Sequence, residues 1–108
     1  MDKKLLGRRI NTSRKNQGIT GEELAELCNI NPTYLRQIES GAKTPSLPMF
    51  VLICEKLQVS PSYLLADSLS GIDRDEIESF FRNATPQQIK LVRTIIKSML
   101  NSSDFLTE

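Results

Sequence analysis

The chain has 108 residues, of which 39% are hydrophobic and 25% charged, values typical of one folded domain. A formal net charge of +1 argues, taken alone, against a basic protein that coats nucleic acid. Because the sequence contains no His, it lacks the residue needed for Ser-His-Asp and Cys-His nucleophiles, His-containing zinc sites and an imidazole base. We therefore expect neither an enzyme nor a cofactor nor a metal site.

The cysteines and the N-terminus favour a cytoplasmic location. Cys28 and Cys54 stand apart in apolar stretches without a CxxC spacing, as buried thiols do in a reducing compartment. The N-terminal residues lack an apolar signal-peptide region, and the longest apolar run, residues 49–54, is far short of the ~20 residues that cross a bilayer. We expect no association with a membrane.

Short helices separated by Gly, Pro and capping residues predict an all-α fold. A first helix ends near Gln17, before Gly18, and its expected inward residues are Leu5, Leu6, Ile10 and Ser13. A second helix begins after Thr20, which has capping-box spacing to Glu23. The inward residues expected for this second helix are Leu24, Leu27 and Cys28.

The next segment predicts a tight turn followed by a third helix. Asn29 tolerates a left-handed backbone, Asn31 is a good N-cap, and Pro32 suits a first helical position. The third helix ends at Gly41. Polar residues three and four positions apart line its outer face: Thr33, Arg36, Gln37 and Ser40. A fourth helix is expected around residues 49–57 and a fifth around residues 61–65.

The C-terminal part predicts two more helices after a linker at residues 67–72, which separates a domain at 1–66 from an oligomerisation region at 73–108. The sixth helix begins with a capping box at Asp73 and Glu76, and the seventh runs from about residue 86 to 100. Apolar residues cover about half of its circumference, which predicts a homodimer; folding back onto the first domain is the alternative. The expected interface residues are Ile89, Val92, Ile95, Ile96, Met99 and Leu100.

Two short helices joined by a tight turn, the second with an outward polar face, have the geometry that places a helix in the major groove of DNA. Residues over positions 4–66 make a more specific match: Leu6-Gly7-Arg8-Arg9-Ile10, Arg14, Gly18, Thr20, Glu22-Glu23-Leu24-Ala25-Glu26, Ile30, Tyr34-Leu35, Ile38-Glu39, Gly41, Pro45-Ser46 and Val59-Ser60. This set resembles the Cro/C1-type, or XRE-like, helix-turn-helix family. The resemblance implies a five-helix lambda-repressor-like domain that binds double-stranded DNA, here followed by two C-terminal helices.

The resemblance also implies roles for individual residues. Base contacts are expected from Thr33, Arg36 and Gln37, since Arg reads guanine and Gln reads adenine through paired hydrogen bonds; a solvated helix face is the alternative. The expected phosphate or groove-edge contacts are Thr20, Tyr34, Ser40, Lys43 and Thr44. For Tyr34, packing on the fourth helix is an equal alternative.

Two further features follow from the same comparison. The family implies an ion pair between Arg14 and Glu39 inside the domain, so we exclude Arg14 from the DNA contacts. One departure counts against the match: Gly21 stands where members commonly carry a Gln that contacts phosphate. Affinity is therefore expected to be lower, or the position on DNA to be set by other groups.

The leading hypothesis is a transcriptional regulator that acts as a homodimer on a palindromic operator, with repression as the simplest mechanism. One alternative is an antitoxin or restriction-controller protein that regulates its own promoter and, as an antitoxin, also holds a protein partner. Another is a helical protein-interaction module that does not bind DNA.

Charge is divided unevenly along the chain. Residues 1–66 hold nine Lys or Arg and six Asp or Glu, whereas residues 67–108 hold five and seven. The small net charge therefore does not exclude DNA. The modest excess of +3 in the first part predicts weak non-specific binding and favours a dimer that reads sequence.

Overall fold

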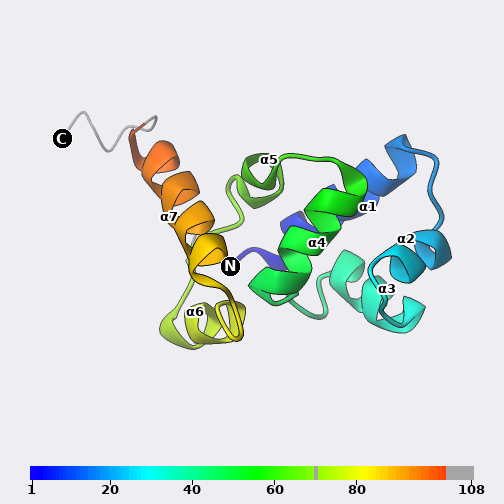
Figure 1. The fold of residues 1–108 in the computed structure, drawn as a ribbon, viewed down its shortest axis with the longest axis horizontal. Helices are drawn as coiled ribbons and strands as arrows, with labels where there is room; N and C mark the ends of the chain where they lie inside the picture. Colours follow the sequence, from blue (N-terminus) through cyan, green and yellow to red (C-terminus); the bar gives the residue numbers. More distant parts are fainter. Residues whose placement is uncertain (70, 102–108) are drawn as a thin grey trace.

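The computed structural model describes residues 1–69 and 71–101, and side chains through residue 98. These residues form seven helices and no strand (Figure 1). In chain order the helices are α1 (Lys3–Asn16), α2 (Gly21–Leu27), α3 (Pro32–Ser40), α4 (Leu47–Leu57), α5 (Pro61–Leu65), α6 (Arg74–Phe80) and α7 (Pro86–Asn101). The predicted all-α architecture, five helices followed by two, is confirmed.

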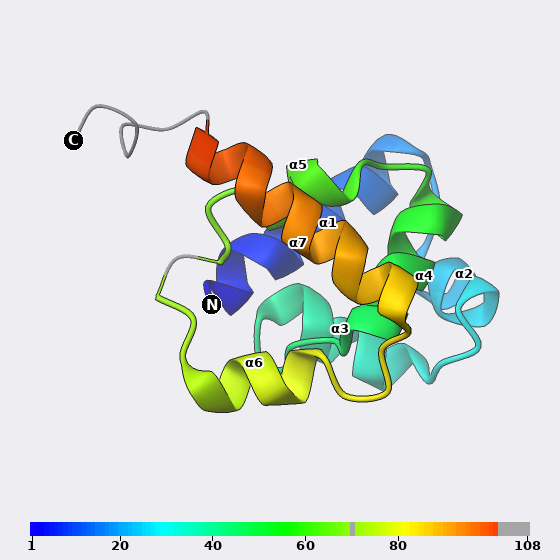
Figure 2. The same ribbon diagram turned by 60° about the vertical axis from the view of Figure 1, so that its left-hand side comes forward.

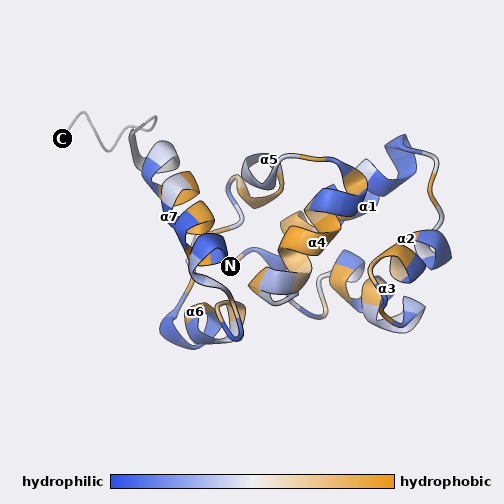
Figure 3. Cartoon of the chain, in the orientation of Figure 1, coloured by the Kyte–Doolittle hydropathy of each residue, from blue (hydrophilic) through white to orange (hydrophobic). Residues whose placement is uncertain are grey.

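Helix α4 is the centre of the hydrophobic core, and it carries the broadest apolar surface of the seven helices (Figure 3). Its buried side chains are Leu47, Phe50, Ile53, Cys54 and Leu57. On one side α4 packs against the helix-turn-helix region, and on the other it meets α7 (Figure 2). The ring of Phe50 lies 6.2 Å from that of Phe80 at the end of α6, measured between centroids. One hydrophobic core therefore connects the helix-turn-helix region with the C-terminal helices in the part of the chain that the structure describes.

One residue expected to face inward is exposed, and two residues expected at the dimer interface are buried in the core. Leu27 is 48% exposed, because it is the last residue of a seven-residue helix and projects beyond the contact with α4. Val92 and Ile95 are 1% and 5% exposed, so they already pack into the core and leave a narrower surface for a second copy. Met99 and Leu100 are also expected interface residues, but their side chains lie outside the part of the chain that the structure describes.

The segment expected to be a linker is partly packed against the domain. Ser68 is buried, and its hydroxyl donates to the carbonyl of Leu64 at 3.2 Å. The amide of Asp2 donates to the carbonyl of Ser68 at 2.6 Å, which ties this segment to the start of α1. Among the described helices, none has the length and apolar character needed to cross a membrane.

Candidate nucleic-acid interface

A tight turn joins α2 to α3. Asn29 has φ 55°, the left-handed conformation expected from its residue type. The amide of Ile30 donates to the carbonyl of Ala25 at 2.9 Å and closes the turn. Ala25 is fully buried, and because its side chain is small, α2 and α3 can approach closely. Buried side chains fix the crossing of the two helices: Leu24, Cys28, Leu35 and Ile38.

The outer face of α3 presents the residues predicted to contact bases. Asn31 caps the helix by accepting a hydrogen bond from the amide of Thr33 at 2.7 Å. Thr33 and Arg36 are exposed, and Gln37 is half-buried. One guanidinium nitrogen of Arg36 donates to the hydroxyl of Thr33 at 3.0 Å, so the two side chains lie together on this face. The outer face of α3 thus presents several side chains that can form hydrogen bonds with a partner.

The loop after α3 holds the predicted phosphate contacts. The Lys43 amide donates to the carbonyl of Gln37 at 3.0 Å, and its ammonium lies 6.0 Å from the ring centroid of Tyr34. Tyr34 is half-buried and packs against the hydrophobic core. The Ser40 hydroxyl donates to the Gln37 carbonyl at 3.1 Å and accepts from the Ala42 amide at 3.3 Å, so it stabilises the turn.

The helix-turn-helix unit is anchored to α1 by an ion pair between Arg14 and Glu39. The distance from Arg14 Nε to Glu39 Oε2 is 2.8 Å and that from Nη2 to Oε1 is 3.0 Å, an arrangement with two parallel hydrogen bonds. Arg14 Nη1 donates to the carbonyl of Ile19 at 2.9 Å. The hydrogen bonds and charge of Glu39 raise the pKa of the Arg14 guanidinium. Arg14 faces the domain interior, at 12% side-chain exposure.

Sequence reasoning missed two features of this anchor. Asn11 donates to Glu39 Oε1 at 2.6 Å, so the carboxylate has a second side-chain partner. A Cβ at Gly7 would strike the carbonyl oxygen of Ile38 and lie 2.5 Å from that of Glu39, so the glycine lets α1 touch the end of α3. A glycine inside an apolar helical pattern is the signal that could have found this close approach.

Thr20 begins α2 with the predicted capping box. Its hydroxyl accepts a hydrogen bond from the Glu23 amide at 3.1 Å, and Glu23 Oε1 accepts one from the Thr20 amide at 3.0 Å. The hydrogen bond from the Thr20 amide, followed by one from the Thr20 hydroxyl, lowers the pKa of the Glu23 carboxyl group. Thr20 is exposed at the N-terminus of α2. At the neighbouring Gly21, the nearest atom to an added Cβ is 4.0 Å away, so this surface is open.

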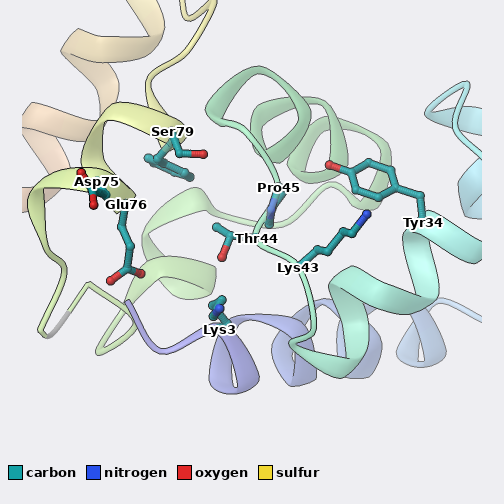
Figure 4. A pocket seen from close by; sticks show the side chains of 9 residues that line it. Lys3, Tyr34, Lys43, Thr44, Pro45, Asp75, Glu76 and Ser79 are labelled. Atoms are coloured by element: carbon teal, nitrogen blue, oxygen red, sulfur yellow. The ribbon is translucent and has the colours of Figure 1, made fainter.

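A cleft of about 380 Å³ lies between the α3–α4 loop and α6 (Figure 4). Its lining comes from α1, α3, the loop and α6: Lys3, Tyr34, Lys43, Thr44, Pro45, Asp75, Glu76, Ser79 and Phe80. The loop side carries Lys43 and Thr44, whereas the α6 side carries the carboxylates of Asp75 and Glu76. The sequence could not reveal this cleft, because its loop and α6 residues are some 30 positions apart.

A smaller groove of about 250 Å³ lies along the outer side of α7. Phe81, Ile89 and Ile96 form its apolar lining, and Arg93 and Lys97 also border it. Ile96 is 37% exposed, and Ile89 is half-buried. Among the described residues, no three His, Cys, Asp or Glu side chains are grouped so that they could hold a metal ion.

Comparisons with known proteins agree with this geometry. The sequence profile of the family described as "Helix-turn-helix" matches residues 10–64. The transcriptional regulator ClgR of Mycobacterium tuberculosis is 31% identical over 74 residues, 68% of this chain and 66% of that protein. The HTH-type transcriptional regulator PrpR of the same organism is 27% identical over 74 residues, which are 15% of its length. The chain thus spans slightly less than two thirds of the ClgR relatives.

Two solved structures have a similar fold. The crystal structure of the clp gene regulator ClgR from C. glutamicum is 27% identical, with a TM-score of 0.59 over 68% of this chain and 95% of the other. A SinR protein/SinI protein complex is 24% identical, with a TM-score of 0.55 over 90% of this chain and 99% of the matched chain. The second likeness concerns the fold alone, and it extends beyond the region that the helix-turn-helix profile matches.

Proposed function

Because the chain belongs to the Cro/C1-type helix-turn-helix family of transcriptional regulators, we propose that two copies bind a palindromic DNA operator and repress transcription. The observation that supports this most is the exposed polar face of α3, held by the partly buried Arg14–Glu39 pair. One α3 from each copy enters the major groove, with half-sites about one helical turn apart. RNA polymerase is then blocked by occupancy of the operator.

Each DNA-contacting side chain has a distinct role in this proposal. Arg36 and Gln37 hydrogen-bond to base edges, and Thr33 lies beside Arg36 at the same face. Lys43 and Thr44 contact phosphate and set the orientation of the domain without reading sequence. Further phosphate or groove-edge contacts come from Thr20, Ser40 and Tyr34.

The proposed dimer uses the outer face of α7. On a helical wheel Ile89 and Ile96 lie about 20° apart, and the buried Val92 and Ile95 lie about 60° and 120° from Ile89, so the exposed apolar strip borders the buried one. The same surface on two copies forms a two-fold interface, the commonest arrangement in soluble oligomers. Because the exposed apolar area is narrow, we expect a weak dimer that gains stability when both copies bind DNA.

Selection from a pool of random DNA duplexes followed by sequencing tests binding, spacing and symmetry together. We expect enrichment of a palindrome with half-sites one helical turn apart. Absence of enrichment would contradict operator recognition and would favour the protein-interaction module. Recovery of a single unpaired half-site would contradict the dimer but not DNA recognition.

Two substitutions separate base readout from phosphate contact. Arg36→Ala should cost about 1–3 kcal/mol on the selected operator and relax preference at one base pair. Lys43→Ala should weaken binding evenly on all sequences and reduce the salt slope by about 0.9. If Arg36→Ala weakened binding equally on all sequences, Arg36 would not be a base-reading residue. If the salt dependence of binding were unchanged in Lys43→Ala, Lys43 would not be a phosphate contact.

Light scattering on the full chain tests the dimer. We expect a dimer for the wild type and a monomer for Ile96→Glu, which places a charge in the apolar interface. Leu27→Glu is the matched control, because it adds the same charge at another exposed apolar residue on α2. A wild-type chain that stays monomeric at high concentration, or an Ile96→Glu variant that stays dimeric, contradicts this interface.

A further inference from the structure

The apolar groove along the outer side of α7 has a positively charged border. Phe81, Ile89 and Ile96 form its apolar lining, and Arg93 and Lys97 border it. Both cations are exposed, and within the described part of the chain neither of them forms an ion pair. A ligand that matches this groove therefore combines apolar side chains with carboxylates.

The residues that follow α7 have this chemistry. We call residues 102–108 the C-terminal segment; they lie outside the part of the chain that the structure describes. In its sequence two apolar residues, Phe105 and Leu106, stand between the carboxylates of Asp104 and Glu108, and the segment contains no Lys or Arg. The segment thus complements the groove in both apolar character and charge.

The C-terminal segment is long enough to reach the groove of its own copy. Helix α7 ends at Asn101, and at a rise of ~1.5 Å per residue Ile96 lies ~7.5 Å back along the axis. The four residues that lead from Asn101 to Phe105 span up to ~14 Å when extended, enough for the chain to reverse and place Phe105 on Ile96. The same path brings Asp104 within reach of Lys97, which lies ~6 Å back from the end of α7.

Charge and proximity favour the C-terminal segment over a second copy as the occupant of the groove in the free chain. A second copy brings its own Arg93 and Lys97 to the interface, and these like charges oppose association, whereas the segment brings carboxylates. Attachment to α7 also gives the segment an effective concentration in the millimolar range. A single copy in solution therefore has a ligand for its own groove before it meets another copy.

We propose that Phe105 and Leu106 of each copy occupy the α7 groove of the same copy, and that two copies pair only when the C-terminal segment leaves it. The effect on pairing rests on the proposed dimer, whereas the docking itself does not. Because the proposed dimer uses Ile89 and Ile96, the segment and a second copy compete for the same side chains. A segment that covers the groove in about two thirds of the copies weakens the dimer about ninefold, since both copies must be open.

The first test uses Trp as a probe of docking, because the chain contains none. Acrylamide quenching is measured for Phe105→Trp, alone and combined with Ile96→Glu, at low and at high protein concentration. We expect Phe105→Trp alone to be quenched about threefold less than the combined variant, equally at both concentrations, because the groove shields the probe in about two thirds of the copies. Leu27→Glu is the matched control, since it adds the same charge at an exposed apolar residue that does not line the groove. It should leave the shielding unchanged, and circular dichroism checks that all variants are folded.

The second test measures competition with the dimer. Sedimentation equilibrium gives the dimer dissociation constant of the wild type and of the double variant Phe105→Ser with Leu106→Ser. We expect the double variant to dimerise about ninefold more tightly, because its segment no longer covers the groove. Leu27→Ser, which removes an exposed apolar side chain outside the groove, should dimerise as the wild type does.

The outcomes separate the docking from the proposed dimer. Equal quenching of Phe105→Trp with and without Ile96→Glu would overturn the docking, and so would equal relief of the shielding by Leu27→Glu. Shielding only at high concentration, or a weaker dimer in the double serine variant, would place the segment in the groove of a second copy and would also overturn it. An unchanged dissociation constant in that variant would overturn the competition. Shielding at both concentrations in a chain that never dimerises would support the docking and contradict the proposed dimer.

Discussion

The Arg14–Glu39 pair provides a quantitative test of how the helix-turn-helix unit is held in place. Arg14→Met removes two hydrogen bonds to Glu39 and one to the carbonyl of Ile19, while keeping much of the side-chain volume. The Glu39 side chain is 9% exposed, and Asn11 is the partner that remains. The substitution therefore leaves a nearly buried carboxylate without its cation.

Removing one member of a buried ion pair costs about 3–5 kcal/mol. Because Asn11 still donates to Glu39 and both side chains retain some exposure, we expect a loss at the lower end, about 3 kcal/mol. For a domain of this size such a loss lowers the melting temperature by roughly 10–15 °C. Urea unfolding followed by circular dichroism at neutral pH measures the free energy directly.

The double variant Arg14→Met with Glu39→Leu is the control. It removes both charges and leaves two apolar side chains of similar volume, a replacement that is often neutral for a buried pair. We expect it to be more stable than Arg14→Met alone by about 2 kcal/mol. A loss below 1 kcal/mol for the single variant, or a double variant that is no more stable than it, would refute a buried, coupled pair.

Three further predictions concern packing, capping and thiol chemistry. Gly7→Ala should destabilise the chain by about 1–3 kcal/mol in urea unfolding, since its Cβ would strike the backbone of α3; Gly21→Ala, where space is open, should not. Thr20→Ala should cost about 1 kcal/mol at neutral pH through loss of the cap. Because hydrogen bonds from Thr20 lower the folded-state pKa of Glu23, the stability from its carboxylate is present above its ordinary pKa and lost as pH falls through the lowered value. The difference in unfolding free energy between Glu23→Ala and wild type should therefore shrink in acid; an equal difference at neutral and acid pH would contradict this. Burial raises the pKa of Cys54 to about 12, so mass spectrometry should find it unmodified by iodoacetamide in the native chain at mildly alkaline pH and modified in guanidinium.

Features of the fold that depend on neighbours in sequence could be predicted. The capping box at Thr20, the left-handed Asn29 and the stop at Gly41 each follow from a residue type in a local pattern. The order of the seven helices follows from the same signals. These features fix which residues lie on the outer face of α3, so the face predicted to contact DNA is the one that the fold exposes.

Features that depend on contacts between distant segments could not be predicted. A helical wheel shows that Val92 and Ile95 share the apolar side of α7, but not whether α4 or a second copy covers them. Leu27 looks inward by spacing, yet α2 ends there and nothing in the described part of the chain buries it. The cleft between the α3–α4 loop and α6 likewise depends on where α6 packs.

Because the helix-turn-helix region and the C-terminal helices both pack on α4, we expect them to unfold together. Phe50 meets Phe80 from α6 while the rest of α4 packs with the helix-turn-helix region, so neither part has a complete core without the other. A protease that cut once within residues 67–72 would leave two fragments that remain associated. Amide hydrogens of α4 should exchange with solvent at a single, slow rate set by global unfolding, and mutations in either part should lower that protection together.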